Sequence, residues 1–139
     1  MNNFSNNNCT IYLVRHGETD WNVKKIIQGH KQSILNKNGK DQAKKLAKHF
    51  QNIHIDAIFS SDLLRAKQTA EIVALEKKLA VTTSHLLRER SYGQHEGKLR
   101  DHYYNEVKDL LETFKKLSKK EKWNFKITED MESEENITK

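Results

Sequence analysis

The pattern of hydrophobic and polar positions predicts short strands that alternate with amphipathic helices. Four consecutive apolar residues at 11–14, bounded by polar residues, predict a strand buried on both faces of a parallel sheet. Apolar residues at three- and four-residue spacing then predict a helix over about 37–51, for which Asn36 is the expected N-cap. Alternating apolar positions over 53–59 predict a second strand, and residues 60–62 are expected to cap the helix that follows.

The second half of the chain continues this alternation. Residues 80–87 are expected to form a short third strand and its connection, and the spacing becomes helical again from Asp101. The stretch 123–127 is predicted to be a loop, and Ser133 is in a position to begin another helix. Strands that alternate with helices, with no linker between them, favour one α/β domain. The asparagine-rich stretch 1–9 is predicted to be a disordered tail ahead of that domain.

Composition narrows the class of protein. With 139 residues the chain is long enough for one domain with its own core. It has no apolar run of membrane-spanning length and no signal-peptide pattern at its start, so we expect a cytoplasmic protein that contacts no membrane. Its single cysteine, Cys9, excludes an internal disulfide bond.

The positive charge of the chain has two interpretations. A net charge of +6 is compatible with a nucleic-acid-binding protein. The lysines, however, are scattered in pairs along helical stretches, and no aromatic platform lies among them. We therefore interpret them as a solvated surface that favours the approach of anionic substrates, and we expect no nucleic-acid partner.

Candidate chemistry follows the first predicted strand. Arg15 and His16 come directly after the 11–14 run, at the end of the strand where open α/β sheets bind ligands. Gly17 permits a sharp turn and a close approach to a ligand. Arginine offers a planar charged fork to phosphate, and a neutral imidazole is a nucleophile that can carry a phosphoryl group. These residues together predict phosphoryl transfer through a phosphohistidine.

Cysteine chemistry is the alternative in this stretch. Cys9 and Arg15 have the C-x5-R spacing of cysteine-dependent phosphatases. That mechanism needs a flexible loop of small residues whose amides surround the phosphate, whereas residues 10–14 are a β-forming run. We reject this mechanism and interpret Cys9 as a structural residue.

Three stretches resemble the motifs of one known family. Residues 13–19 (Leu-Val-Arg-His-Gly-Glu-Thr), with Asn22, resemble the signature of the histidine phosphatase superfamily, the phosphoglycerate mutase-like enzymes. Residues 59–70 and 87–93 match further motifs in the expected order. The resemblance implies an α/β fold, a three-layer sandwich with a mainly parallel sheet, whose incomplete domain covers residues 10–139.

The resemblance also implies roles for individual residues. His16 would be the nucleophile, while Arg15, Asn22 and Arg65 would bind the phosphoryl oxygens. Gln28 would line the mouth of the substrate site. Arg65 is expected in the first turn of its helix, where the helix N-terminus adds a favourable potential for an anion. The implied ligand is a small phosphorylated substrate, and no metal or other cofactor is expected because arginines supply the positive charge.

Glu89 is the implied general acid and base. The like charge of a bound phosphoryl group would favour its protonated form, so that it could protonate the leaving oxygen and later deprotonate water. The alternative for Glu89 is an ion pair with Arg88 or Arg90. Two histidines are given no catalytic role: His85 is interpreted as an ordinary strand or loop residue, and His30 as a surface residue.

The chain departs from the family pattern in two places. Residues 30–35 lack the family's aspartate and proline, which affects the geometry of that loop. Residues 131–133 (Met-Glu-Ser) resemble the family's Gly-Glu-Ser element, but nothing after them supplies the second histidine and the central strand of these enzymes. We therefore expect the N-terminal portion of a longer enzyme, with weak or no activity and with uncovered apolar surface at 11–14.

The activity implied for the complete enzyme is phosphomonoester hydrolysis. Gly93 and Gly97 mark a tight loop over the site. Residues 96–98 (Glu-Gly-Lys) resemble the phosphatase branch, including fructose-2,6-bisphosphatase-like enzymes, more than the mutases. Two alternatives stay open. One is a phosphoglycerate mutase, which passes the phosphoryl group to a second acceptor. The other is a non-catalytic phosphate-binding fragment.

Overall fold

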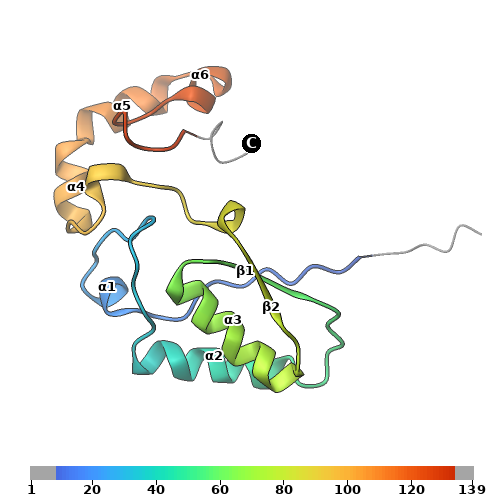
Figure 1. Ribbon diagram of the computed structural model, residues 1–139. Helices are drawn as coiled ribbons and strands as arrows, with labels where there is room; N and C mark the ends of the chain where they lie inside the picture. The colour runs from blue at the N-terminus through green and yellow to red at the C-terminus, as the bar shows by residue number, and fades with distance from the viewer. Residues whose placement is uncertain (1–8, 134–139) are drawn as a thin grey trace, which may run out of the picture.

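The computed structural model describes residues 9–133, so the predicted tail lies outside the described residues except for Cys9. Within this range no helix is long and apolar enough to cross a membrane. Two 3-10 turns, His85–Leu87 and Gly93–His95, lie in the connections. The helices and strands, in chain order, are α1 (Asp20–Val23), α2 (Lys37–His49), β1 (Ile58–Ser61), α3 (Leu64–Lys77), β2 (Val81–Ser84), α4 (Arg100–Glu106), α5 (Lys108–Lys116) and α6 (Lys119–Asn124) (Figure 1).

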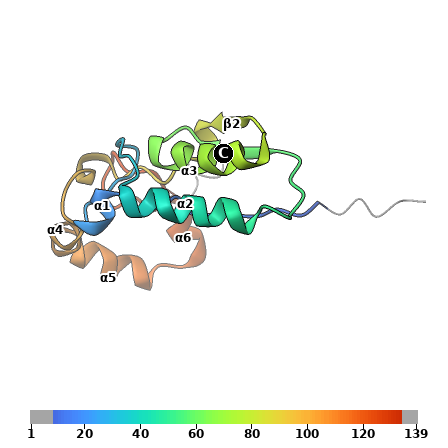
Figure 2. The ribbon, with the colours of Figure 1, turned by 90° about the horizontal axis from the view of Figure 1, so that it is seen from below.

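The sheet of the described structure consists of two parallel strands. β1 pairs with β2 from Ile58 opposite Val81 to Ser61 opposite Ser84. The chain passes from one to the other through α3, the kind of crossover that parallel strands require. α3 lies between the strands and α2 (Figures 1 and 2). The predicted α/β class with parallel strands is therefore confirmed.

Two apolar clusters stabilise the two ends of this arrangement. The first lies between α2 and α3, and its buried members are Ala47, Phe50 and Val73. The second lies where the loop before residue 30 meets the helices drawn in orange in Figure 1, and its buried members are Ile27, Tyr103, Val107 and Met131. The backbone of Ile27 donates to the carbonyl of Lys98 at 3.0 Å and accepts from Gly97 at 2.8 Å, which ties these two loops together.

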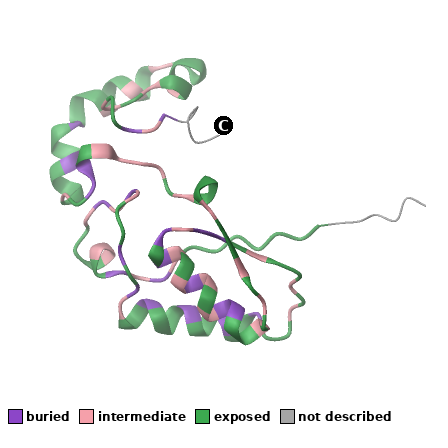
Figure 3. Cartoon of the chain, in the orientation of Figure 1, coloured by how far each residue is buried: buried purple, intermediate pink, exposed green. Residues whose placement is uncertain are grey.

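The segment 11–14 is not the buried strand that the hydrophobic pattern predicts. No described strand pairs with it, and Leu13 and Ile11 are 95% and 83% exposed. Figure 3 shows this stretch as an exposed line that runs past the strands toward the site. Without a hydrogen-bonded neighbour its backbone is not held in a sheet, and its apolar side chains face solvent. The uncovered apolar surface expected at this segment is present.

The predicted cap of α3 is wrong as well. Leu63 precedes this helix and makes no side-chain cap. The hydroxyl of Ser61 instead accepts from the amide of Leu63 at 3.3 Å, within the turn before the helix. The carboxylate of Asp62 is occupied by Arg88, whose Nε and Nη2 donate to it at 2.7 and 2.5 Å. Because both oxygens of the Asp62 carboxylate bind the guanidinium, the carboxylate is oriented toward Arg88 and does not cap α3.

Three other boundaries differ from the prediction. β1 begins at Ile58 rather than residue 53, because the residues before it pack on α2 and α3 without a strand partner. α6 extends into the predicted 123–127 loop, since Ser118 and Glu121 form a capping box that starts this helix. The helix predicted to begin at Ser133 has not begun at this residue, and the residues after it lie outside the described range.

The other predicted elements are confirmed. Asn36 caps α2 by accepting from the amide of Gly39 at 2.8 Å. β2 lies within the predicted 80–87 stretch, and helical structure resumes at Arg100, just before Asp101. Gly93 and Gly97 have φ of 51° and 90°, as the predicted tight loop between them requires.

Replacing Gly39 by alanine tests how closely α2 packs on the loop after His16. An alanine normally stabilises a helix by about 1 kcal/mol relative to glycine. Here a Cβ on Gly39 would lie 2.0 Å from the backbone oxygen of Glu18. We expect Gly39→Ala to lower the free energy of unfolding by about 1–3 kcal/mol in urea denaturation, as overpacking does. Lys40→Ala, in the same turn, should change it by less than about 0.5 kcal/mol. Increased stability of the glycine variant would contradict this packing.

Candidate active site

The loop that carries His16 rests directly on α2 and α3. The amide of Gly17 donates to the hydroxyl of Thr69 at 3.0 Å, and this hydroxyl donates to the carbonyl of Arg65 at 2.8 Å. A Cβ on Gly17 would lie 2.4 Å from the carbonyl oxygen of Gly39, so only glycine permits this approach. The loop therefore places His16 beside the first turn of α3, where Arg65 is located.

The hydrogen bond of His16 defines its tautomer. Nδ1 lies 2.7 Å from the carbonyl oxygen of Gly17. A carbonyl can only accept, so Nδ1 carries the proton, and Nε2 of the neutral ring keeps its lone pair. Half-burial lowers the pKa of His16, and the charges of Arg65 and Arg15 lower it further. The bond to Gly17 and the charge of Glu89 oppose this shift. The ring is thereby kept neutral, as a nucleophile must be.

Arg65 is the most deeply buried charge in the site, with 2% of its surface exposed. Its Nη2 donates to the carbonyl of Gly29 at 2.7 Å, and its Nη1 donates to the carbonyl of Lys31 at 3.1 Å. Burial lowers the pKa of Arg65, and the charges of Glu89 and Glu96 oppose this effect. Two bonds use two of the five N–H donors of a guanidinium, so three remain for an anion.

The other predicted phosphate ligands are Arg15, Asn22 and Gln28. Arg15 is exposed, and its charge reaches the imidazole. Oδ1 of Asn22 accepts from the amide and hydroxyl of Thr19 at 3.0 and 2.9 Å, which completes a capping box at α1. Oε1 of Gln28 lies 3.1 Å from the same hydroxyl, whose single proton is shared between the two oxygens, and it also accepts from the hydroxyl of Ser33. A side-chain amide that accepts through its oxygen keeps its NH2 donors for other partners, and an anion is one such partner.

Glu89 is exposed, and its charge acts on the site from the segment after β2. It raises the pKa of His16 and of Tyr92, which places its carboxylate within electrostatic reach of both rings. Arg88 binds Asp62, so the structure gives no support to the alternative of an ion pair between Glu89 and Arg88.

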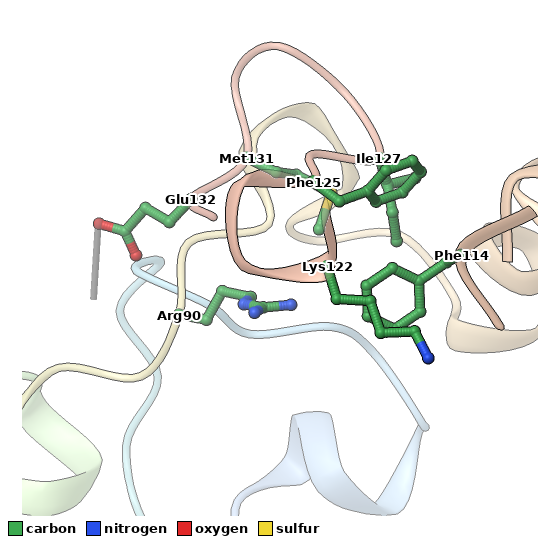
Figure 4. Close-up of a pocket in the computed structure, with 7 residues that line it drawn as sticks. All are labelled: Arg90, Phe114, Lys122, Phe125, Ile127, Met131 and Glu132. Atoms are coloured by element: carbon green, nitrogen blue, oxygen red, sulfur yellow. The ribbon is translucent and has the colours of Figure 1, made fainter. Parts of the chain in front are cut away.

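Arg90 borders a cavity whose lining includes no residue of the catalytic loop. This cavity has a volume of about 30 Å³, and Phe114, Lys122 and Phe125 also line it (Figure 4). The described structure records no ion pair between Arg90 and Glu89, so the second alternative for the glutamate finds no support.

Sequence reasoning missed two residues of the site. His30, predicted to be a surface residue, is half-buried, and its Nε2 donates to the carbonyl of Glu89 at 2.8 Å. Glu96 is 7% exposed and accepts several hydrogen bonds from the loops around it. Neither role could be predicted from neighbouring residues alone, because His30 binds Glu89 and Glu96 binds the amides of residues 30 and 31, which are about 60 residues away in the sequence. The interpretation of His85 as an ordinary residue agrees with its exposed position in a 3-10 turn.

A hollow of about 280 Å³ lies beneath the catalytic loop, between the backbone of 14–17 and the helices. Its lining includes Arg15 and His16, together with Ala43 and Leu46 of α2. Arg15 and His16 thus border this hollow, whereas Arg65 and Glu89 lie outside its lining.

The sequence model of the histidine phosphatase superfamily (branch 1) matches residues 11–137. The chain belongs to this superfamily. A broad-specificity phosphatase of Saccharomyces cerevisiae is 44% identical over 100 residues, which cover 68% of this chain and 44% of the relative. A probable phosphoglycerate mutase of Proteus mirabilis is 47% identical over 83 residues, which cover 60% of this chain and 39% of the relative. The chain thus spans less than half the length of these relatives.

Several solved structures share the fold. A mycobacterial glucosyl-3-phosphoglycerate phosphatase, solved with VO3, superimposes with a TM-score of 0.75 at 26% identity, covering 88% of this chain and 56% of the other. The Bacillus stearothermophilus protein YhfR superimposes with a TM-score of 0.74 at 29% identity, covering 88% and 58%. The predicted phosphoglycerate mutase-like fold class is confirmed, and the chain corresponds to rather more than half of each structure.

The charges around His16 predict how it titrates. We expect its pKa, followed through its ring protons by NMR, to lie below the ordinary value of about 6.5. Because the folded pKa is the lower one, the unfolded chain binds more protons below about pH 6.5, and stability falls as the pH falls through that range. Arg15→Gln should raise the pKa, since it removes a cation, and Glu89→Gln should lower it further. Lys116→Gln, on α5, is the control. Shifts of equal sign in the first two variants would contradict the placement of these charges.

Proposed function

We propose that this superfamily member is a phosphomonoester hydrolase that works through a phosphohistidine at His16. The observation that carries the proposal is the state of the ring: half-buried, with Nδ1 bound to the Gly17 carbonyl, and with its pKa lowered by burial and by the charges of Arg65 and Arg15. Such a ring offers the lone pair of Nε2 to an electrophile that the two arginines attract.

The first step transfers the phosphoryl group to the histidine. Arg15, Asn22 and Arg65 bind the phosphoryl oxygens, and Gln28 contributes at the edge of the site. Nε2 of His16 attacks phosphorus in line with the ester oxygen. The P–N bond forms as the P–O bond to the leaving group breaks, and Glu89 gives its proton to the leaving oxygen.

The second step releases phosphate. The carboxylate of Glu89 removes a proton from water, the water oxygen bonds to phosphorus, and the P–N bond breaks, which restores the neutral ring of His16. The phosphorylated imidazole is positively charged, and the hydrogen bond from Nδ1 to the Gly17 carbonyl stabilises that charge. The arginines supply the charge stabilisation that metal ions supply in other phosphoryl transferases.

Sugar phosphates are the substrate class that we propose. The support is the broad-specificity phosphatase of yeast and the mycobacterial glucosyl-3-phosphoglycerate phosphatase among the similar proteins. The Glu-Gly-Lys sequence at 96–98, which resembles the fructose-2,6-bisphosphatase-like branch, agrees with this class. A phosphoglycerate mutase is the second candidate, because several relatives carry that name. Product analysis with 3-phosphoglycerate separates the two, since a mutase returns a phosphoglycerate isomer and a phosphatase returns inorganic phosphate.

The proposal predicts which variants lose phosphate release. We expect this chain to release phosphate only weakly from p-nitrophenyl phosphate and from a panel of sugar phosphates, and His16→Ala to abolish the release. Glu89→Gln should reduce it by about 10²- to 10⁴-fold, the usual effect of removing a general acid. His85→Ala is the matched control, because this histidine is exposed and has no proposed role in the reaction.

Each other outcome has a definite meaning. Release that survives His16→Ala would overturn the phosphohistidine mechanism. If the folded chain releases no phosphate but binds inorganic phosphate through Arg65, it is a binding fragment rather than a catalyst.

A further inference from the structure

One peptide group of the structure lies between two buried charges. The carbonyl of Gly29 accepts from Nη2 of Arg65 at 2.7 Å, and the amide of His30 in the same peptide unit donates to Oε1 of Glu96 at 2.9 Å. In a trans peptide the C=O and N–H groups point in opposite directions. The guanidinium and the carboxylate therefore bind opposite edges of one peptide group. Each charge polarises this peptide group and so strengthens the hydrogen bond that the other charge makes to it.

Lys31 also binds both charges, through its own amide and its own carbonyl, which belong to successive peptide groups. Its amide donates to Oε2 of Glu96 at 3.1 Å, and its carbonyl accepts from Nη1 of Arg65 at 3.1 Å. Both carboxylate oxygens and both terminal guanidinium nitrogens are thus bound to the short loop 29–31. A fork held at both tips has a fixed plane. The orientation of the guanidinium consequently depends on where Glu96 holds this loop.

The same carboxylate also binds the segment that carries Glu89. Oε1 of Glu96 accepts from the amide of Tyr92 at 2.9 Å and from the hydroxyl of Ser91 at 3.1 Å. On the other side of this junction, Nε2 of His30 donates to the carbonyl of Glu89 at 2.8 Å. Glu96 therefore joins the loop that orients Arg65 to the segment that presents Glu89.

The approach of this carboxylate is built into the loop. Gly29 has φ of 49°, and a Cβ at this position would lie 2.1 Å from Oε1 of Glu96. Glu96 is 7% exposed, so its charge is removed from water and is compensated by the donors around it. A buried carboxylate with this many donors holds them strongly, because losing it would leave them unsatisfied.

We infer that Glu96 is a positioning residue for phosphoryl transfer. Through the backbone of residues 29–31 and 91–92 it fixes the positions of Arg65 and of the Glu89 segment relative to His16. This role rests on the proposed function, because the groups that Glu96 orients are those proposed to bind and protonate the substrate. Glu96 itself does not touch the phosphoryl group.

A measurement without ligand tests whether Glu96 holds Arg65. Nitrogen-15 NMR spectra report on the arginine side chains, and the signals that disappear in R65K are those of Arg65. We expect separate signals for the two Nη groups of Arg65, because their hydrogen bonds to residues 29 and 31 slow the rotation of the guanidinium. E96Q keeps the shape of the side chain but replaces acceptor oxygen with an amide donor. It should merge the Arg65 signals into one average, whereas E76Q, an exposed change of equal charge on α3, should leave them separate. Unchanged Arg65 signals in folded E96Q would overturn the inference.

A double-mutant cycle with inorganic phosphate tests the consequence for binding. E96Q should weaken phosphate binding about tenfold, a usual coupling within one hydrogen-bond network, when Arg65 is present. In the R65K background it should change binding less than about twofold, since the oriented fork is already lost. An equal loss in both backgrounds would mean that Glu96 only stabilises the fold, and would overturn the inference.

Two further results are interpretable. If E96Q does not fold, E96D is used in its place. The aspartate keeps the negative charge, but its shorter side chain does not extend to the amides of residues 30 and 31. The results expected for E96D are those given for E96Q. If the unsubstituted chain binds no phosphate, the proposed function is wrong for this chain, and the NMR comparison alone decides whether Glu96 orients Arg65.

Discussion

The structure of the site depends on the burial of one guanidinium. An arginine keeps its charge at neutral pH, so the burial of Arg65 requires hydrogen-bond acceptors in place of the water that is excluded from the guanidinium. The fold supplies two of them from the backbone of residues 29–31 and places two carboxylates within electrostatic reach. The loop 29–31 is therefore not free to vary, although it has no regular secondary structure. Its course is a consequence of the charge that it surrounds.

The ends of the two parallel strands bring the remaining groups to this charge. β1 ends at Ser61 and leads into α3, whose first turn carries Arg65, while β2 ends at Ser84 and leads toward Glu89. The 15–19 loop, packed on α2 and α3, adds His16. Three chain segments that are distant in sequence thus meet beside the same edge of the sheet, as parallel α/β proteins generally arrange their ligand sites. Arg65 and Arg15 bring positive charge to the surroundings of His16, and Glu89 brings a negative one.

The sequence predicted what local chemistry determines and missed what distant contacts determine. The Asn36 cap of α2 and the position of Arg65 in the first turn of α3 are readable from a few neighbouring residues, and both are confirmed. Asp62 was expected to cap α3 but binds Arg88 instead, and the role of Glu96 depends on amides at positions 30, 31 and 92. The 11–14 run has the composition of a strand. A strand also needs a neighbouring strand to hydrogen-bond with, and no strand of the described structure pairs with this run. The catalytic and binding roles of the individual residues remain predictions, because the family assignment and the geometry support them without testing them.

The central claim is that His16 itself carries the phosphoryl group. The most direct test is to mix the chain with p-nitrophenyl phosphate, stop the reaction in alkali, where phosphohistidine survives, and locate the added phosphoryl group by mass spectrometry of the peptides. The account predicts phosphorylation of the peptide that contains His16, with loss of the label in acid. Phosphorylation of Cys9 or of any other residue, with His16 unmodified, would contradict it.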